Sequence, residues 1–222
     1  MIPAATSMVL CAGPRRKPPR PILAIVVLLM AANAAAGPTP EQGMFLIANA
    51  EMRGSWFAET VILLVQHDAS GTVGIIVNRR TDARPADLLP EIEELARLQS
   101  GLYIGGPVEA HGLLMLVRSD GPPADAEHVF GNVYVSGSQP LLRQLLSGTD
   151  SADRLRLYAG YAGWVPGQLD AEIGRGSWTV IPATESAVFA TDPNDVWHRL
   201  RPPARRLIVR RDAATRIAGA LP

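Results

Sequence analysis

Two carboxylates lie close together in the stretch from Tyr158 to Trp178, "YAGYAGWVPGQLDAEIGRGSW". Paired carboxylates can act as general acid and base, for example in the hydrolysis of glycosidic bonds. Asp170 and Glu172 are two residues apart, however, and on a helix their side chains diverge by about 200°. The spacing therefore excludes a facing carboxylate pair and suggests instead an ion pair between Glu172 and Arg175.

The residues around these acids predict a short helix that follows a strand. Pro166 suits the first helical position because it has no N–H group to leave unpaired. Leu169 and Ile173 are four residues apart and share a face that can pack inward. Gly174 and Gly176 then end the helix and release the chain into the next strand.

Gly160 and Gly163 precede this helix, and their surroundings allow two interpretations. A strand-to-helix junction presents free backbone N–H groups, which can bind an anion. The alternative is a structural corner that Trp164 closes, with Gln168 hydrogen-bonded to the loop. The glycine spacing does not match a dinucleotide fingerprint, so no nucleotide cofactor is predicted.

Other motifs with known chemistry are scarce. A second glycine motif, "GGPV" at 105–108, follows a predicted strand and indicates a turn with close backbone approach. The four histidines show no zinc-ligand spacing, and the only cysteine is Cys11. Neither a P-loop nor a nucleophile elbow occurs. The sequence therefore predicts no metal site and no cofactor, and it assigns no nucleophile with its base.

Short apolar and β-branched runs outnumber helical patterns along the chain. They show no βαβ alternation, no internal repeat and no heptads, which favours an α+β fold with a mixed sheet. Turn residues at 68–71 separate two of these runs and predict a hairpin. The predicted strands are 44–48, 60–67, 72–78, 102–104, 113–119, 128–136, 154–161 and 177–183, and the further helices are 85–99, 139–148 and 193–200. Within 85–99, Pro90 suggests that the helix itself starts near that residue.

The first 36 residues have the three-part pattern of a secretory signal peptide. A basic patch at 15–20 precedes the apolar run 22–32, and Ala34 and Ala36 fit a cleavage site. We expect export to the periplasm or cell envelope, with transient membrane contact through this segment. The alternatives are an uncleaved membrane anchor and, if the start codon is misassigned, a cytoplasmic protein. The remaining divisions are a linker at 37–43, a single domain at 44–200 and a basic tail at 201–222.

Charge separates the tail from the domain. Residues 37–198 contain 10 basic and 20 acidic residues, a net charge of −10, whereas 199–216 contain seven arginines and one aspartate. An acidic body repels phosphate backbones, and no two adjacent helices form a helix-turn-helix, so we expect no direct nucleic-acid binding. We expect the tail to pack against the acidic body, with nucleic acid or anionic lipid as alternative partners.

Four segments occur in a characteristic order: "GMFLIA" (43–48), "FAETVILLVQHDASGTVGIIVNR" (57–79), "GGPV" (105–108) and "GYAGWVPGQLDAEI" (160–173). Together they resemble the YqgE/AlgH family of bacterial proteins over about residues 43–200. The resemblance implies an α+β fold whose mixed sheet curls into a barrel-like core with peripheral helices. It brings the label of transcriptional regulator, from a genetic association with alginate production, and no established reaction. The motif positions it implies are Gly105, Gly106, Pro107, Gly160, Gly163, Trp164, Gly167, Gln168, Leu169 and Glu172.

Two functions are compatible with these residues. The first is a non-catalytic binding or regulatory domain, holding an unidentified protein or small molecule in a glycine-lined groove near 105–108 and 160–168. The second is a hydrolase-type enzyme that uses His67, Gln168 and Glu172 in one pocket. A water-accessible Glu172 beside both glycine motifs would favour either function, whereas a surface ion pair with an arginine would indicate a structural role.

Overall fold

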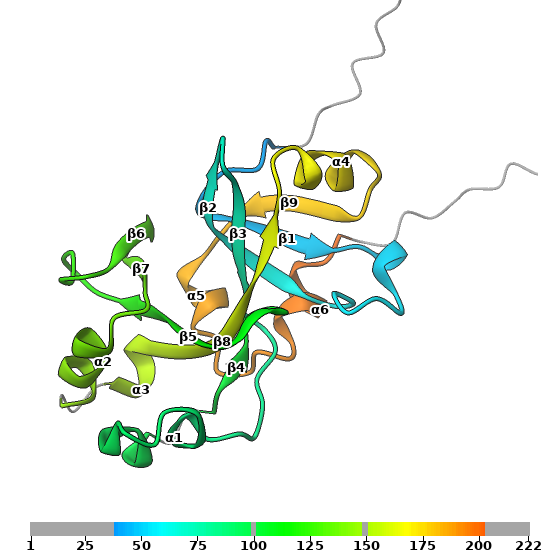
Figure 1. Cartoon of the computed structure of the whole chain (residues 1–222). Helices are drawn as coiled ribbons and strands as arrows, with labels where there is room; N and C mark the ends of the chain where they lie inside the picture. Colours follow the sequence, from blue (N-terminus) through cyan, green and yellow to red (C-terminus); the bar gives the residue numbers. More distant parts are fainter. Residues whose placement is uncertain (1–37, 99–100, 148–150, 203–222) are drawn as a thin grey trace, which may run out of the picture. The chain divides into compact units, whose positions relative to one another are not determined.

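The computed structural model describes residues 38–98, 101–147 and 151–202, in which one curved sheet is surrounded by short helices (Figure 1). The strands are β1 (Met44–Ala48), β2 (Val61–Asp68), β3 (Gly71–Ile76), β4 (Tyr103–Ile104), β5 (Val108–Arg118), β6 (Glu127–Phe130), β7 (Val133–Ser136), β8 (Leu155–Trp164) and β9 (Trp178–Pro182). The helices are α1 (Pro85–Leu88), α2 (Gln139–Leu146), α3 (Ser151–Arg154), α4 (Gln168–Gly174), α5 (Glu185–Val188) and α6 (Val196–Leu200), with 3₁₀ turns at Ala50–Met52 and Glu93–Arg97.

The predicted signal segment at 1–36 and the tail beyond residue 202 lie outside the described residues. The predictions of export and of a tail packed on the acidic body therefore stay predictions. Within the part of the chain that the structure describes, no helix has the length and apolarity needed to cross a membrane.

The sheet curls into a half-barrel with the strand order β6-β7-β5-β8-β3-β2-β1-β9, and β4 pairs with β8. Neighbours along this order are antiparallel, whereas β4 and β8 are parallel, so the sheet is mixed. The outermost strand β6 approaches the segment before β1, where Gln42 Nε2 donates to His128 O at 2.7 Å. At Gly43, an added Cβ would lie 2.9 Å from the Cβ of Phe130. The predicted α+β fold with a barrel-like sheet is confirmed.

Alternating side chains bury both faces of the sheet. In β2, Val61, Leu63 and Val65 belong to the core on the concave side. Ile62 and Leu64 point to the opposite face and join a second core beneath α4. Because successive strand residues point to opposite faces, five buried residues in a row mark a strand that is covered on both sides.

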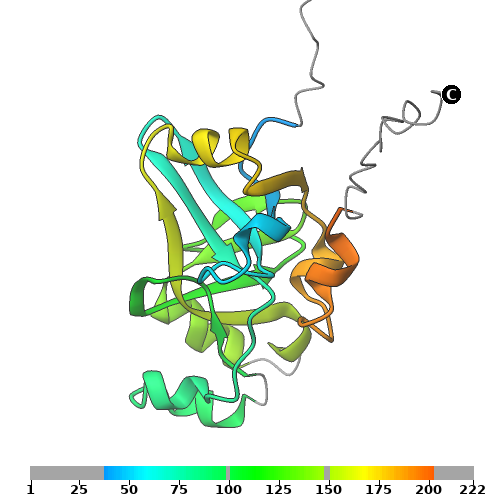
Figure 2. The same cartoon turned by 90° about the vertical axis from the view of Figure 1, so that its right-hand side faces the viewer.

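Helices cover the sheet in three places (Figures 1 and 2). α5 with the following Phe189, and α6, supply Val188, Phe189, Val196 and Trp197 to the concave core. α4 covers the outer face of β1 and β2, whereas α2 and the segment 85–98 cover the outer face of β5 and β8. In both views α4, in yellow, and α1, in teal, lie at opposite ends. The sheet therefore supports two separate outer surfaces.

The two glycine motifs meet backbone to backbone. Gly105 N donates to Ala159 O at 2.8 Å, and an added Cβ on Gly105 would lie 2.2 Å from Gly160 O. An added Cβ on Gly106 would lie 1.9 Å from the carbonyl carbon of Tyr161. Gly160 also has a φ of +69°, in the left-handed region that glycine adopts without strain. The close backbone approach predicted for the second glycine motif is confirmed.

We expect Gly106→Ala to prevent folding or to lower the free energy of unfolding by more than about 3 kcal/mol, because the obstructing atoms belong to the backbone. Gly174→Ala is the matched control, since no atom lies within 4 Å of its added Cβ. Urea unfolding of both variants measures the difference. A Gly106→Ala protein as stable as the wild type would contradict this packing.

The predicted helix at 85–99 is wrong in its extent. α1 covers only its first turn and ends before Pro90, where the helix was predicted to start, and only a 3₁₀ turn follows. Leu89, between them, has φ −129° and ψ 72°. The following Pro90 disfavours the helical conformation at Leu89 and removes one backbone N–H, which interrupts the helix.

The predicted strand at 128–136 is also wrong, because it is a hairpin of two strands, β6 and β7. Gly131 and Asn132 form the turn, and Gly131 has a φ of +49°. A Gly-Asn pair between two apolar runs is a hairpin signal that the sequence offered. The remaining predicted strands and the helices at 139–148 and 193–200 are present, with their ends shifted by a few residues.

Tyr158 is fully buried in the concave core, and its hydroxyl has no hydrogen-bond partner among the residues the structure describes. Its ring lies 5.2 Å from that of Tyr103, centre to centre. Burial, reinforced by Tyr103, raises the pKa of the Tyr158 phenol far above its usual range, so the group is neutral. An unpaired buried hydroxyl costs about 1–3 kcal/mol of stability.

We therefore expect Tyr158→Phe to preserve stability or to raise it by up to about 1 kcal/mol, since the ring stays and only the unpaired group is removed. Thermal unfolding at pH 7 measures the effect. A loss of more than about 1 kcal/mol would show that the hydroxyl has a partner in solution.

Candidate functional site

The motif residues gather around the carboxylate of Glu172. Its Oε2 accepts hydrogen bonds from the indole N–H of Trp164 at 3.0 Å and of Trp178 at 2.8 Å, and its Oε1 accepts from Gln168 Nε2 at 3.0 Å. The two indole side chains are only 6% and 3% exposed, so their N–H groups need a partner inside the protein. One carboxylate therefore joins the end of β8, the start of β9 and the helix α4.

Aromatic rings pack beside this carboxylate. Phe57 stacks on Trp164 at 6.4 Å between ring centres and makes an edge contact with Trp178 at 5.8 Å. Its neighbour Trp56 is 45% exposed, and the guanidinium of Arg79 lies 4.6 Å from the Trp56 ring centre. The cluster thus extends from a part-buried carboxylate contact to an exposed aromatic ring.

The loop between β8 and α4 is a tight corner. Gly167 caps the helix with a φ of +77°, and Gln168 Oε1 accepts from Val165 N at 3.3 Å. Pro166 therefore lies before the helix, and the prediction that it occupies the first helical position is wrong: the left-handed Gly167 turns the chain into the helix. Leu169 is 2% exposed and packs inward as predicted.

Gly160 and Gly163 do not lie at a junction with a helix, because β8 continues to Trp164. Gly163 pairs with Val73 in β3, and Gly160 packs against Gly106 O, 2.6 Å from its added Cβ. Of the two interpretations of these glycines, the row of free N–H groups is therefore wrong, whereas the corner closed by Trp164, with Gln168 hydrogen-bonded to the loop, is present. The two glycine motifs do come together, as expected, but their backbones fill the space between them.

Hydrogen bonds keep the Glu172 carboxylate ionised. Burial alone would raise its pKa, but the hydrogen bonds from Trp178, Gln168 and Trp164, with the longer-range attraction of Arg175, outweigh burial and lower the pKa below its usual range. The suggested ion pair with Arg175 is not among the contacts of the described residues, because both carboxylate oxygens face the indoles and the amide.

His67 is not among the hydrogen-bond partners of the Glu172 carboxylate. His67 Nδ1 lies 2.7 Å from Thr72 Oγ1.

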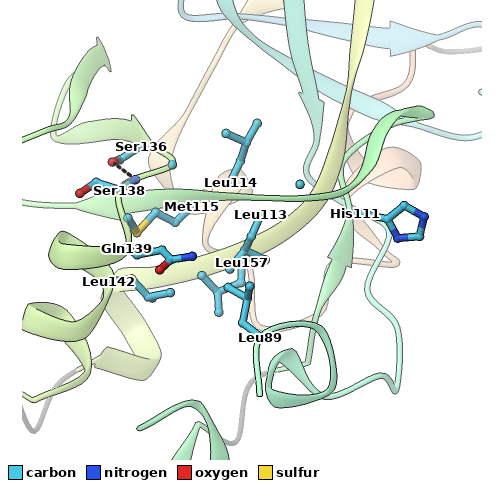
Figure 3. A pocket seen from close by; sticks show the side chains of 12 residues that line it. Leu89, His111, Leu113, Leu114, Met115, Ser136, Ser138, Gln139, Leu142 and Leu157 are labelled. Atoms are coloured by element: carbon cyan, nitrogen blue, oxygen red, sulfur yellow. Dashed lines mark hydrogen bonds between the residues drawn. The ribbon is translucent and has the colours of Figure 1, made fainter. Parts of the chain in front are cut away.

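Within the described ranges, no group of three or more His, Cys, Asp or Glu side chains is placed to hold a metal ion. A pocket of about 230 Å³ opens between α1, α2 and β5 (Figure 3), and none of the predicted motif residues lines it.

Known proteins are similar to this chain over most of its length. The model of the AlgH-like family matches residues 45–202. The chain belongs to the AlgH-like family. A UPF0301 protein of Methylococcus capsulatus is 36% identical to this AlgH-like chain over 164 residues, which cover 72% of the chain and 90% of the relative. A UPF0301 protein of Rhodococcus jostii is 33% identical over 174 residues, covering 74% and 83%.

Two solved AlgH-like structures have the same fold. The crystal structure of a protein from Corynebacterium diphtheriae aligns with a TM-score of 0.64 at 30% identity, covering 78% of this chain and 92% of that one. The solution structure of AlgH from Pseudomonas aeruginosa aligns with a TM-score of 0.62 at 29% identity, covering 74% and 88%. The names of these relatives state no reaction and no ligand.

The sequence-based reasoning missed two residues of this AlgH-like cluster, Trp178 and Phe57. Trp178 lies six residues after Glu172 at the start of a predicted strand, and a buried indole there needs an acceptor. The need of the Trp178 indole N–H for an acceptor was the signal by which the sequence could have placed Trp178 near Glu172. Phe57 offered no such signal, because its contacts depend on how the loop before β2 packs against Trp164 and Trp178.

We expect Glu172→Ala to lower the free energy of unfolding by about 2–4 kcal/mol, because two buried indole N–H groups lose their acceptor. Asp170→Asn, on the exposed face of the same helix, is the control and should change stability by less than about 0.5 kcal/mol. Urea unfolding at pH 7 compares them. Equal effects would contradict the structural role of Glu172.

The pH dependence follows from the lowered pKa of Glu172. A carboxylate with a lowered pKa in the folded state contributes fully above its unfolded pKa, about 4.3 for glutamate, and the contribution is lost as the pH falls through the folded value. The stability difference between wild type and Glu172→Gln should therefore shrink below about pH 4. Urea unfolding from pH 7 to pH 3 measures this, and a constant difference would contradict it.

Proposed function

We propose that this AlgH-like chain is a non-catalytic binding domain with a regulatory role. The observation that carries this proposal is the occupation of Glu172 by three hydrogen-bond donors of the same cluster. A carboxylate whose pKa is lowered holds no proton to donate at neutral pH, and three donors already occupy most of its lone pairs. Glu172, the motif residue best suited to acid–base chemistry, thus stabilises the fold through these hydrogen bonds.

The competing hypothesis is a hydrolase that uses His67, Gln168 and Glu172. It needs a base within about 3 Å of the group it activates, directly or through one water. The recorded partner of His67 is Thr72, and Gln168 is engaged by Glu172 and by the backbone of Val165. These contacts favour the binding function over the hydrolase.

We further propose that the partner is a small molecule or a protein and that DNA is not bound directly. Residues 37–198 carry the net charge of −10 described above, which disfavours contact with a phosphate backbone. A regulatory effect on transcription would then act through another protein.

A paired assay of the full chain tests this function. Hydrolysis of p-nitrophenyl acetate, phosphate and glucoside should be no faster than in buffer, and Glu172→Gln and His67→Ala should change nothing. A thermal-shift screen of neutral fragments, sugars and nucleotides should yield at least one saturable stabiliser. Saturable hydrolysis that either substitution reduces, in a folded variant, would overturn the proposal, as would a screen without any binder.

A further inference from the structure

The residues that line the pocket between α1, α2 and β5 (Figure 3) include none of the motif cluster around Glu172. Its volume of about 230 Å³ exceeds that of a cavity of about 150 Å³ that accepts benzene. Four elements or their ends supply its apolar wall. The apolar side chains that line it are Leu89, Leu113, Leu114, Met115, Leu142 and Leu157.

One polar side chain, the solvent-exposed Gln139, borders these apolar side chains and makes no hydrogen bond to another described residue. Figure 3 shows Gln139, at the start of α2, directed among the leucines, and its amide has no partner within the part of the chain that the structure describes. The two serines of the lining are already engaged: Ser136 Oγ donates to Asp125 O at 2.5 Å, and Ser138 Oγ accepts from Leu141 N at 3.3 Å. Gln139 can therefore both donate to and accept from a bound molecule.

The charge of the lining selects a neutral ligand. No Asp, Glu, Lys or Arg is among the lining residues, and the one ionisable side chain, His111, lies at the other end from Gln139 (Figure 3). A charged head group would lose hydration here without gaining an ionic partner. The acidic domain also repels anions.

We propose that this pocket binds a small neutral amphipathic molecule. An aromatic ring or a short branched chain lies among the leucines, and one amide or hydroxyl group pairs with the amide of Gln139. This proposal rests on the proposed binding function and names the ligand class for it. The fit resembles that of many small-molecule sites, where a few placed polar groups orient a ligand on an apolar surface.

Four probes that share one ring test the ligand class. Toluene is apolar, benzamide adds a neutral donor and acceptor, benzoate is anionic and benzylamine is cationic at pH 7. NMR titration of the full chain with labelled methyl groups follows Leu113, Leu142 and Leu157. We expect benzamide to bind more tightly than the other three and to shift these methyl signals.

Matched substitutions on one helix test the polar contact. Gln139→Leu should weaken benzamide binding about tenfold, the value of one hydrogen bond, and leave toluene unchanged or tighter. Gln144→Leu, the same change at an exposed position of α2 outside the lining, should alter neither. Gly137→Leu should weaken both probes, because its added Cβ meets only ordinary contacts at 3.7 Å and the longer side chain occupies the pocket.

The outcomes separate this inference from the proposed function. If benzamide shifts signals elsewhere and not the three leucines, the domain binds ligands but the pocket assignment is overturned. Equal loss with Gln139→Leu and Gln144→Leu, or tighter binding of benzoate or benzylamine, overturns the neutral ligand class. If no probe binds while another compound binds in the thermal-shift screen, the inference fails and the binding function stands.

Discussion

A single bend in β8 allows this strand to serve both halves of the half-barrel. Leu155–Ala159 pairs with β5, which also meets Tyr161 after a shift of register, whereas Ala162–Trp164 pairs with β3. Between them, left-handed Gly160 turns the strand, and the backbone of Gly105 and Gly106 fills the space beside the bend, where no side chain would fit. The concave core and the cores beneath the two outer surfaces depend on this bend, because each contains residues of β8.

The same strand explains why the motif after the bend combines glycines, tryptophan, glutamine and glutamate. β8 delivers Trp164 to the outer face, Gly167 turns the chain into α4, and α4 returns Glu172 to the indole of Trp164. Trp178 then fixes β9 to the same carboxylate. Each polar group of this motif satisfies another, which stabilises the return of the chain to the sheet edge.

Local sequence patterns predicted those parts of the fold that depend on residues close together in the chain. The hairpin of β2 and β3 followed from β-branched runs around turn residues, and the close approach at the second glycine motif followed from its composition. The partners of Glu172 could not be read in this way: spacing suggested Arg175, whereas the indoles reach Glu172 only once β8, α4 and β9 are assembled. The pocket was missed because its leucines have the periodicity of ordinary core residues.

The two outer surfaces therefore differ in what they can offer a ligand. On the surface beneath α4, Glu172 and Gln168 direct most of their hydrogen-bonding capacity at the protein itself. Binding there would first have to break bonds that hold the fold, so affinity and stability would oppose each other. At the other surface, Gln139 has no internal bond to break, and an apolar space lies beside it. Recognition at that surface can therefore change without weakening the carboxylate contacts that hold β8, α4 and β9 together.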